Sequence, residues 1–201
     1  AADGEIGKVK EFYFDDKFWT VRYLVADTGG WLTGRQVLIS PYALENINMD
    51  DKVINTRLTK QKIEDSPSLN QDRPVSRQFE ETYYGYYGWP AYWYGPFAWG
   101  GFYYPAPAAV PPARAGAEVR AEQEKWDPHL RSSHEVTGYN IQANDGDIGH
   151  VDDFLVDDET WMIRYLVIDT MNWWPGKEVL LAPKWIDRIS WDEHNVFVNM
   201  D

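Results

Sequence analysis

Residues 4–41 read GEIGKVKEFYFDDKFWTVRYLVADTGGWLTGRQVLISP, and residues 146–183 read GDIGHVDDFLVDDETWMIRYLVIDTMNWWPGKEVLLAP. The two stretches align without a gap, so their glycines, acidic turns, aromatic residues and closing proline coincide. A unit repeated within one chain is the sequence signature of a repeat architecture. We therefore predict two copies of one small domain, in residues 1–65 and 132–201, joined by a linker over residues 66–131.

Within each copy, short runs of β-forming residues alternate with turn residues. In the second copy we expect strands over residues 138–143, 149–156, 161–168 and 177–181, then a helical turn that starts at Pro183 and a last strand near 195–199. In the first copy the equivalent last strand is 53–56, and Thr59 is placed to cap a short helix over residues 60–65. Five or six short strands with little helix predict an all-β fold of two small closed barrels with short helical turns.

The two copies differ at their ends. The first has no counterpart of residues 131–142, which hold the first strand of the second copy, and the second has no counterpart of the helix at 60–65. Because the sequence also lacks an initiator Met, we expect it to be a fragment or a chain with further residues at its ends. An unpaired strand edge recruits partners. We therefore expect another segment to cover the open edge of the first copy, and a homodimer or a strand-exchanged assembly would supply one.

Three motifs occur twice in the same order: G-D/E-I-G-x-V-x-D/E-F-x-x-D-D, W-x-x-R-Y-L-V-x-D-T, and G-K/R-x-V-L followed by a proline. In these motifs the chain resembles the PRC-barrel family, which is known from the cytoplasmic domain of the photosynthetic reaction centre H subunit and from the C-terminal domain of a ribosome maturation factor. The tandem arrangement is most similar to the stand-alone bacterial members. The resemblance implies compact β-barrels that act as docking or assembly modules, with no family catalytic residue to transfer.

Composition excludes several classes of function. There is no cysteine, which removes disulfides, thiolate metal sites and cysteine nucleophiles. No apolar run approaches the roughly 20 residues that span a bilayer, and the first residues do not form a signal peptide. Of the net charge of -13, about -10 lies on residues 132–201. The sequence has no stripe of basic residues that could bind phosphate groups, which disfavours nucleic acids and anionic membranes as partners. We expect a soluble, cytoplasmic, acidic protein whose partner is another protein.

The paired acids Asp15-Asp16 and Asp157-Asp158 are candidates for cation ligands or for an acid–base couple. Both pairs fall at predicted hairpin turns, where Asp side chains bond to the backbone, and no EF-hand spacing surrounds them. We interpret them as turn residues. A hydrolase that uses them is the third functional hypothesis.

The other candidates also have structural interpretations. Asp27 and Asp169 each end a strand before a threonine, as turn starters do, although an acid at a barrel mouth could also contact a partner. The histidines form no ligand cluster in sequence, and tight turns account for the repeated glycines. No phosphate-binding, dinucleotide or nucleophile-elbow motif is present, so we expect no cofactor. These histidines and glycines are His129, His134, His150, His194, Gly4, Gly7, Gly146 and Gly149.

The linker is unusually aromatic between residues 83 and 104 and proline-rich from 105 to 112. Its glycine and proline content predicts that no regular helix or strand runs through the aromatic part, and a short helix is expected near residues 117–126. Three interpretations stay open: the rings pack on the two barrels, bind a protein partner, or contact a membrane interface. The predicted partner-binding residues are Tyr83, Tyr84, Tyr86, Tyr87, Trp89, Trp93 and Trp99.

The leading functional hypothesis is a non-enzymatic protein-interaction or assembly module. The alternative, implied only by likeness to the H subunit, is an accessory of a membrane-bound photosynthetic or electron-transfer complex.

Overall fold

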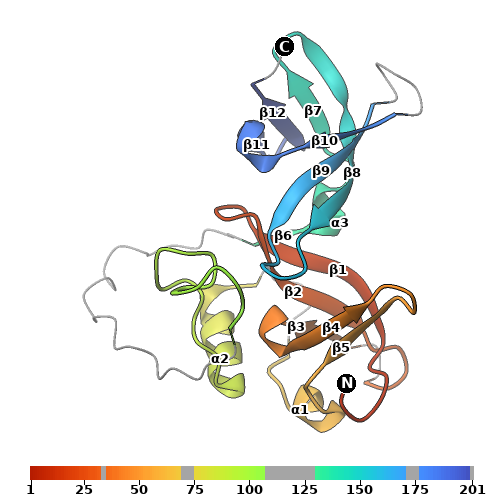
Figure 1. The fold of residues 1–201 in the computed structure, drawn as a ribbon, viewed down its shortest axis with the longest axis vertical. Coiled ribbons are helices and arrows are strands. Elements are labelled where there is room, and N and C mark those ends of the chain that lie inside the picture. Colours follow the sequence, from red (N-terminus) through yellow and green to blue (C-terminus); the bar gives the residue numbers. More distant parts are fainter. Residues whose placement is uncertain (33–34, 69–74, 107–129, 171–176, 200–201) are drawn as a thin grey trace.

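The structure is a computed structural model that describes residues 1–32, 35–68, 75–106, 130–170 and 177–199. Both repeats consist mostly of strands, as the sequence predicts (Figure 1). The first repeat contains β1 (Lys8–Asp15), β2 (Thr20–Asp27), β3 (Gln36–Ile39), η1 (Pro41–Ala43), β4 (Leu44–Asn48), β5 (Val53–Thr56) and α1 (Lys60–Glu64). The helix α2 (Arg77–Tyr87) lies in the linker, the strand β6 (Leu130–Ser132) lies where the linker meets the second repeat, and the helix α3 (Ser133–Val136) follows it. The second repeat contains β7 (Asn140–Ala143), β8 (Gly146–Val156), β9 (Ile163–Asp169), β10 (Glu178–Leu181), η3 (Pro183–Trp185), β11 (Ile186–Ser190) and β12 (Asn195–Val198).

The second repeat forms one six-stranded sheet in the order β10-β9-β8-β7-β12-β11. All its pairs are antiparallel except β7 with β12, which is parallel. The prediction of a closed barrel is wrong for the described residues of the second repeat. Its two end strands, β10 and β11, do not pair with each other, so the sheet stays open. The turn η3 separates them, and Pro183 at its start has no backbone N–H to donate to a ladder.

Strands β1–β5 of the first repeat correspond to β8–β12 of the second, and equivalent residues are 142 positions apart, but the sheet of the first repeat is divided. Strands β3, β2, β1 and β6 form one sheet in that order, whereas β4 and β5 form a separate hairpin. In the second repeat β7 lies between β8 and β12 and joins the two parts, and the described residues of the first repeat contain no counterpart of it. As a result Val9 of β1 is 49% exposed, whereas its equivalent Val151 is fully buried.

The strand β6 confirms the prediction that another segment covers the open edge of the first repeat. Tyr13 of β1 lies opposite Ser132, and Asp15 lies opposite Leu130. The covering segment comes from the same chain, directly before the second repeat. It reaches only the last part of β1, so Val9 is left exposed.

The two repeats meet through their equivalent β-hairpins. The backbone N–H of Val21 donates to the carbonyl of Trp161 at 2.8 Å, and the N–H of Ile163 donates to the carbonyl of Trp19 at 2.7 Å. Each bond joins the same two positions of the repeat in exchanged roles, as in a contact with two-fold symmetry. The tandem chain is therefore an internal pseudo-dimer, and the predicted homodimer stays a prediction.

The local predictions outside the linker are largely confirmed. The strand at residues 53–56 and the turn that starts at Pro183 are present, and Thr59 caps α1 by accepting a bond from the N–H of Lys62. The strands β4 and β11, which follow the helical turns, were not predicted. The helix expected near 117–126 lies outside the described residues.

The prediction that no helix enters the aromatic part of the linker is wrong, because α2 runs through Tyr87. Ser76 caps its start by accepting a bond from the N–H of Phe79, and Gly88, at a φ of 73°, ends it in the left-handed conformation. Gly85 costs the helix about 1 kcal/mol relative to Ala. The two caps and the packing of one face offset that cost.

The backbone of β8 at Gly149 lies so close to β9 that a side chain there would clash. A methyl group on its Cα would lie 1.9 Å from the carbonyl oxygen of Asp169. We expect Gly149→Ala to lower the free energy of unfolding by about 1–3 kcal/mol, because the backbone of β8 must move away from β9. Chemical denaturation measures the change. Gly85→Ala is the matched control, since it meets no atom within 4 Å and improves a helix; equal stability of the two variants would contradict the prediction.

Candidate functional site

The aromatic segment, defined as residues 77–104, covers the outer face of β2 and β3 (Figure 1). Tyr83 and Tyr84 of α2 are almost fully buried, and the Tyr83 hydroxyl donates to the carbonyl of Leu38 in β3 at 2.6 Å. The ring of Tyr83 meets that of Tyr23 edge-on, with centroids 5.5 Å apart. These contacts confirm the interpretation that linker rings pack on a repeat.

A buried carboxylate, Glu80, organises this interface. It is fully buried and accepts hydrogen bonds from the hydroxyls of Tyr23 at 2.9 Å and Tyr92 at 2.6 Å, while Arg77 lies 2.8 Å from its other oxygen. Burial and the Glu80 charge raise the pKa of both tyrosines well above the ordinary value, so both hydroxyls stay protonated donors. A buried charge needs such partners. Glu80 therefore links α2, β2 and the loop that follows α2.

A second buried charge, Arg22 of β2, lies under the same segment. Its guanidinium pairs with Asp15 at 2.6 Å, and its centre lies 3.8 Å from the ring centroid of Tyr92 and 4.7 Å from that of Trp99. The Trp99 indole donates to the carbonyl of Thr160 at 2.8 Å, in the β8–β9 turn of the second repeat. The aromatic segment therefore contacts both repeats through Trp99.

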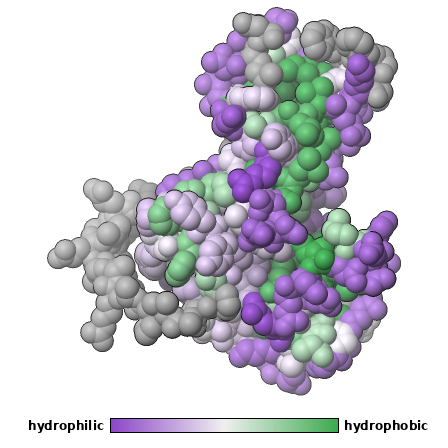
Figure 2. Space-filling view, viewed as in Figure 1, coloured by the Kyte–Doolittle hydropathy of each residue, from purple (hydrophilic) through white to green (hydrophobic). Residues whose placement is uncertain are grey.

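The equivalent face of the second repeat is exposed. The same ion pair is present, since Arg164 lies 2.9 Å from Asp157, and Tyr165 and Leu180 follow at the positions that α2 covers in the first repeat. Figure 2 shows hydrophobic surface along the second repeat, over β8 and β9. The exposed fractions of equivalent pairs are 0% for Tyr23 and 40% for Tyr165, 4% for Leu38 and 45% for Leu180, and 0% and 47% for the side chains of Arg22 and Arg164.

The seven aromatic residues predicted to bind a partner divide into two groups. Tyr83, Tyr84 and Trp99 are buried, and the other four keep partial exposure. Partner binding by these residues stays a prediction. The largest exposed rings of the segment lie elsewhere, at Tyr103 and Tyr104, which sequence patterns alone did not single out. The partly exposed four are Tyr86, Tyr87, Trp89 and Trp93.

The paired acids lie at the β1–β2 and β8–β9 turns, which confirms their interpretation as turn residues. Asp15 accepts a bond from the N–H of Phe18 at 2.7 Å, and Asp157 accepts one from the N–H of Thr160 at 2.8 Å. Asp16 pairs with Arg131 of β6 at 3.0 Å. Both turns therefore use the first acid of the pair to close the hairpin.

The remaining candidates also lie in turns and strands. Asp27 accepts a bond from the N–H of Gly29 at 2.9 Å, as a turn starter does, and Asp169 is the last residue of β9. His150 lies in β8, whereas His129 falls outside the described residues. Within the described part of the chain, no group of three or more acidic or histidine side chains could hold a metal ion.

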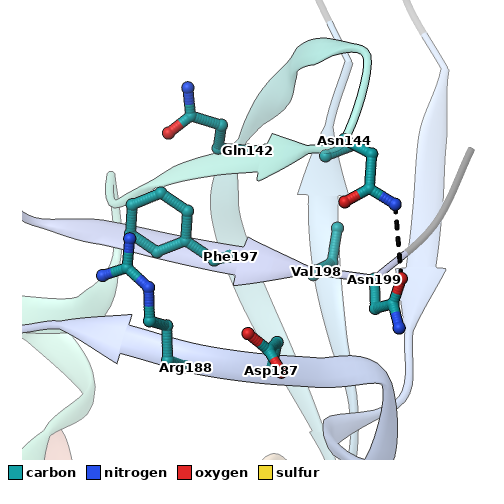
Figure 3. A pocket seen from close by; sticks show the side chains of 8 residues that line it. Gln142, Asn144, Asp187, Arg188, Phe197, Val198 and Asn199 are labelled. Atoms are coloured by element: carbon teal, nitrogen blue, oxygen red, sulfur yellow. Dashed lines mark hydrogen bonds between the residues drawn. The ribbon is translucent and has the colours of Figure 1, made fainter.

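An open depression of about 350 Å³ lies across β7, β12 and β11 (Figure 3). The guanidinium of Arg188 lies over the Phe197 ring, 3.5 Å from its centroid, and Asn144 donates to Asn199 at 3.2 Å. Asp187 is the one carboxylate among its described lining residues. A single carboxylate beside an arginine does not form the carboxylate pair that glycoside hydrolases use. The lining residues are Gln142, Ala143, Asn144, Asp187, Arg188, Phe197, Val198 and Asn199.

The fold and these surfaces define a tandem-repeat β protein in which other segments of the chain cover one face and part of one edge of the first repeat. A family model described as PRC-barrel domain matches residues 1–63 and 128–199. The chain belongs to the PRC-barrel family, as the duplicated motifs predict. A search of the curated proteins finds no match. In the described residues, no helix is long and apolar enough to cross a membrane.

Replacing Glu80 tests whether it organises the aromatic interface. We expect Glu80→Ala to lower the free energy of unfolding by about 3 kcal/mol, because it leaves buried hydroxyls and Arg77 without their acceptor. Thermal and chemical denaturation measure the loss. Glu81→Ala, at the exposed neighbouring position, should change stability little. Similar effects of the two substitutions would contradict the role of Glu80.

Acid should weaken the second turn through Asp157. Backbone and side-chain bonds from Thr160, with the nearby Arg164, lower the pKa of Asp157 to about 2. The unfolded-state pKa is about 3.9, so the stabilisation is complete above that pH and is lost as pH falls towards 2. We expect the midpoint of thermal unfolding to fall less steeply between these pH values in Asp157→Asn than in the wild type. Asp158→Asn is the control and should keep the wild-type slope.

Proposed function

We propose that this protein is a non-enzymatic, cytoplasmic interaction module that binds polypeptide segments on the edges and outer faces of its two repeats. One observation carries the proposal: the first repeat already binds two segments from outside itself, and it uses a different physical mode for each. The PRC-barrel family membership is consistent with a non-catalytic module.

The first mode is strand addition, in which an extended segment pairs with a free sheet edge through its backbone. β6 pairs with β1 from Tyr13 to Asp15. Side chains support the pairing, since Ser132 is hydrogen-bonded to Glu11 and the Ser133 hydroxyl accepts a bond from the N–H of Phe12. The second mode is the packing of the aromatic segment on β2 and β3, with Glu80 at its centre.

Among the residues that the structure describes, no strand pairs with β1 beside Val9. In the second repeat, Val151 accepts a bond from the N–H of Gly138 at 2.7 Å and donates to the carbonyl of Tyr139 at 2.9 Å. Val9 has the same register to β2 as Val151 has to β9. Its N–H and carbonyl are therefore directed to the place where β7 lies in the second repeat.

A peptide with the sequence of residues 138–143 tests the proposal on the full chain. We expect it to slow hydrogen exchange of the Val9 amide by about tenfold or more at saturation, because that amide gains a strand partner. Mass spectrometry or NMR measures the exchange. Val151 is the internal control, since β7 already protects it. A peptide with serine in place of Tyr139 and Ile141 should protect Val9 less, and unchanged exchange with both peptides would refute the proposal.

A further inference from the structure

We infer that the outer face of the second repeat, formed by Leu155, Arg164, Tyr165 and Leu180, binds an aromatic helix of a partner protein in the way that the first repeat binds α2. The inference rests on the proposed function and names the partner class for one face. Leu155 and Tyr165 lie opposite one another on β8 and β9, and Leu180 lies opposite Val167 on β10. Alternation along the strands places Leu155, Tyr165 and Leu180 on one side of the sheet. Arg164 precedes Tyr165 directly and lies at the register shift between Leu155 and Val156, where a β-bulge interrupts the alternation.

Three of the four receptor residues are the same in both repeats, and the fourth, Leu155, corresponds to Tyr13. Tyr23 and Tyr165 occupy equivalent positions, and so do the ion pairs Asp15–Arg22 and Asp157–Arg164. The strand ladder that presents them is also shared, since Leu24 pairs with Ile39 in the first repeat as Leu166 pairs with Leu181 in the second. The face of the second repeat is therefore built like one that binds a helix, but its groups are half-exposed.

The first repeat shows what an occupant must supply. Glu80 provides the carboxylate that accepts the bond from the Tyr23 hydroxyl, and Tyr83 donates to the carbonyl of Leu38. The ring of Tyr92, from the loop after α2, lies over the guanidinium of Arg22, 3.8 Å from its central carbon. An occupant of the second repeat therefore needs a Glu on a helix, a Tyr one turn later, and a further ring to cover Arg164. Aromatic side chains that bury a large area are typical anchors of such interfaces.

Charge and exposure favour this occupant. The second repeat carries a net charge of about -10, so basic residues around the helix would speed its association. The helix α2 itself starts with a basic residue, since Arg77 lies 2.8 Å from Glu80 of the same helix and 4.4 Å from the ring centroid of Trp93. The occupant is therefore an aromatic helix with one buried Glu and basic flanks.

The chain's own aromatic segment serves as the probe. A labelled peptide with the sequence of residues 76–104 is titrated with the full chain, and fluorescence anisotropy measures its binding. We expect Leu180→Asp to weaken binding at least tenfold and Val179→Asp to change it less than twofold. The two residues are equally exposed neighbours on β10, but their side chains lie on opposite sides of the sheet. A peptide that carries Glu80→Ala should also bind at least tenfold more weakly.

Three results would overturn the inference: no binding at millimolar concentration, equal effects of the two Asp substitutions, or equal binding of the peptide without Glu80. Light scattering adds a fourth. If the chain self-associates and Leu180→Asp abolishes that self-association, a second copy occupies the face. A chain that protects Val9 with the strand peptide but fails these tests keeps the proposed function and loses only this partner.

Discussion

The structure depends on two reciprocal backbone hydrogen bonds, from Val21 to Trp161 and from Ile163 to Trp19. They hold the two equivalent hairpins against each other and bring the equivalent rings of Phe12 and Phe154 to 5.4 Å. Because this contact is fixed, the chain segment that precedes the second repeat lies beside β1, where β6 can pair with it. Trp99 also reaches the second repeat next to the same hairpin. The contact between repeats therefore positions both segments that cover the first repeat.

Both repeats contain a carboxylate–arginine pair at the start of the central hairpin, but its surroundings differ. In the first repeat the pair is buried under Tyr92 and Trp99, and in the second it is partly in water. Removing charges from water is costly, and the flat contact of rings with a guanidinium recovers part of that cost. The aromatic segment is therefore as much a part of the first repeat's core as its strands are. Glu80 and the hydroxyls of Tyr23 and Tyr92 satisfy one another within this buried interface.

The repeat and its turns were predictable because local signals determine them. Asp15 and Asp157 close their hairpins through bonds within three residues, and Thr59 caps α1 in the same local way. The strand β6 was not predictable, because it has three residues and its partner on β1 is more than a hundred residues away. The helix α2 was missed because Gly85 and nearby prolines argue against a helix locally, whereas burial of Tyr83 and Tyr84 favours it. The exposed face of the second repeat follows only from comparing the two repeats in three dimensions.

The pseudo-two-fold contact has a consequence for how such a protein can change. In a true homodimer every substitution appears twice, so both subunits keep the same surface. Here the two halves of the pair are encoded separately, and each position can vary on one side alone. Arg22 and Arg164 occupy equivalent positions of the two repeats, yet the side chain of Arg22 is fully buried and that of Arg164 is exposed to solvent. Because the two repeats are joined in one chain, the first repeat can keep the buried contacts that hold the protein together, while surface residues of the second repeat can change independently.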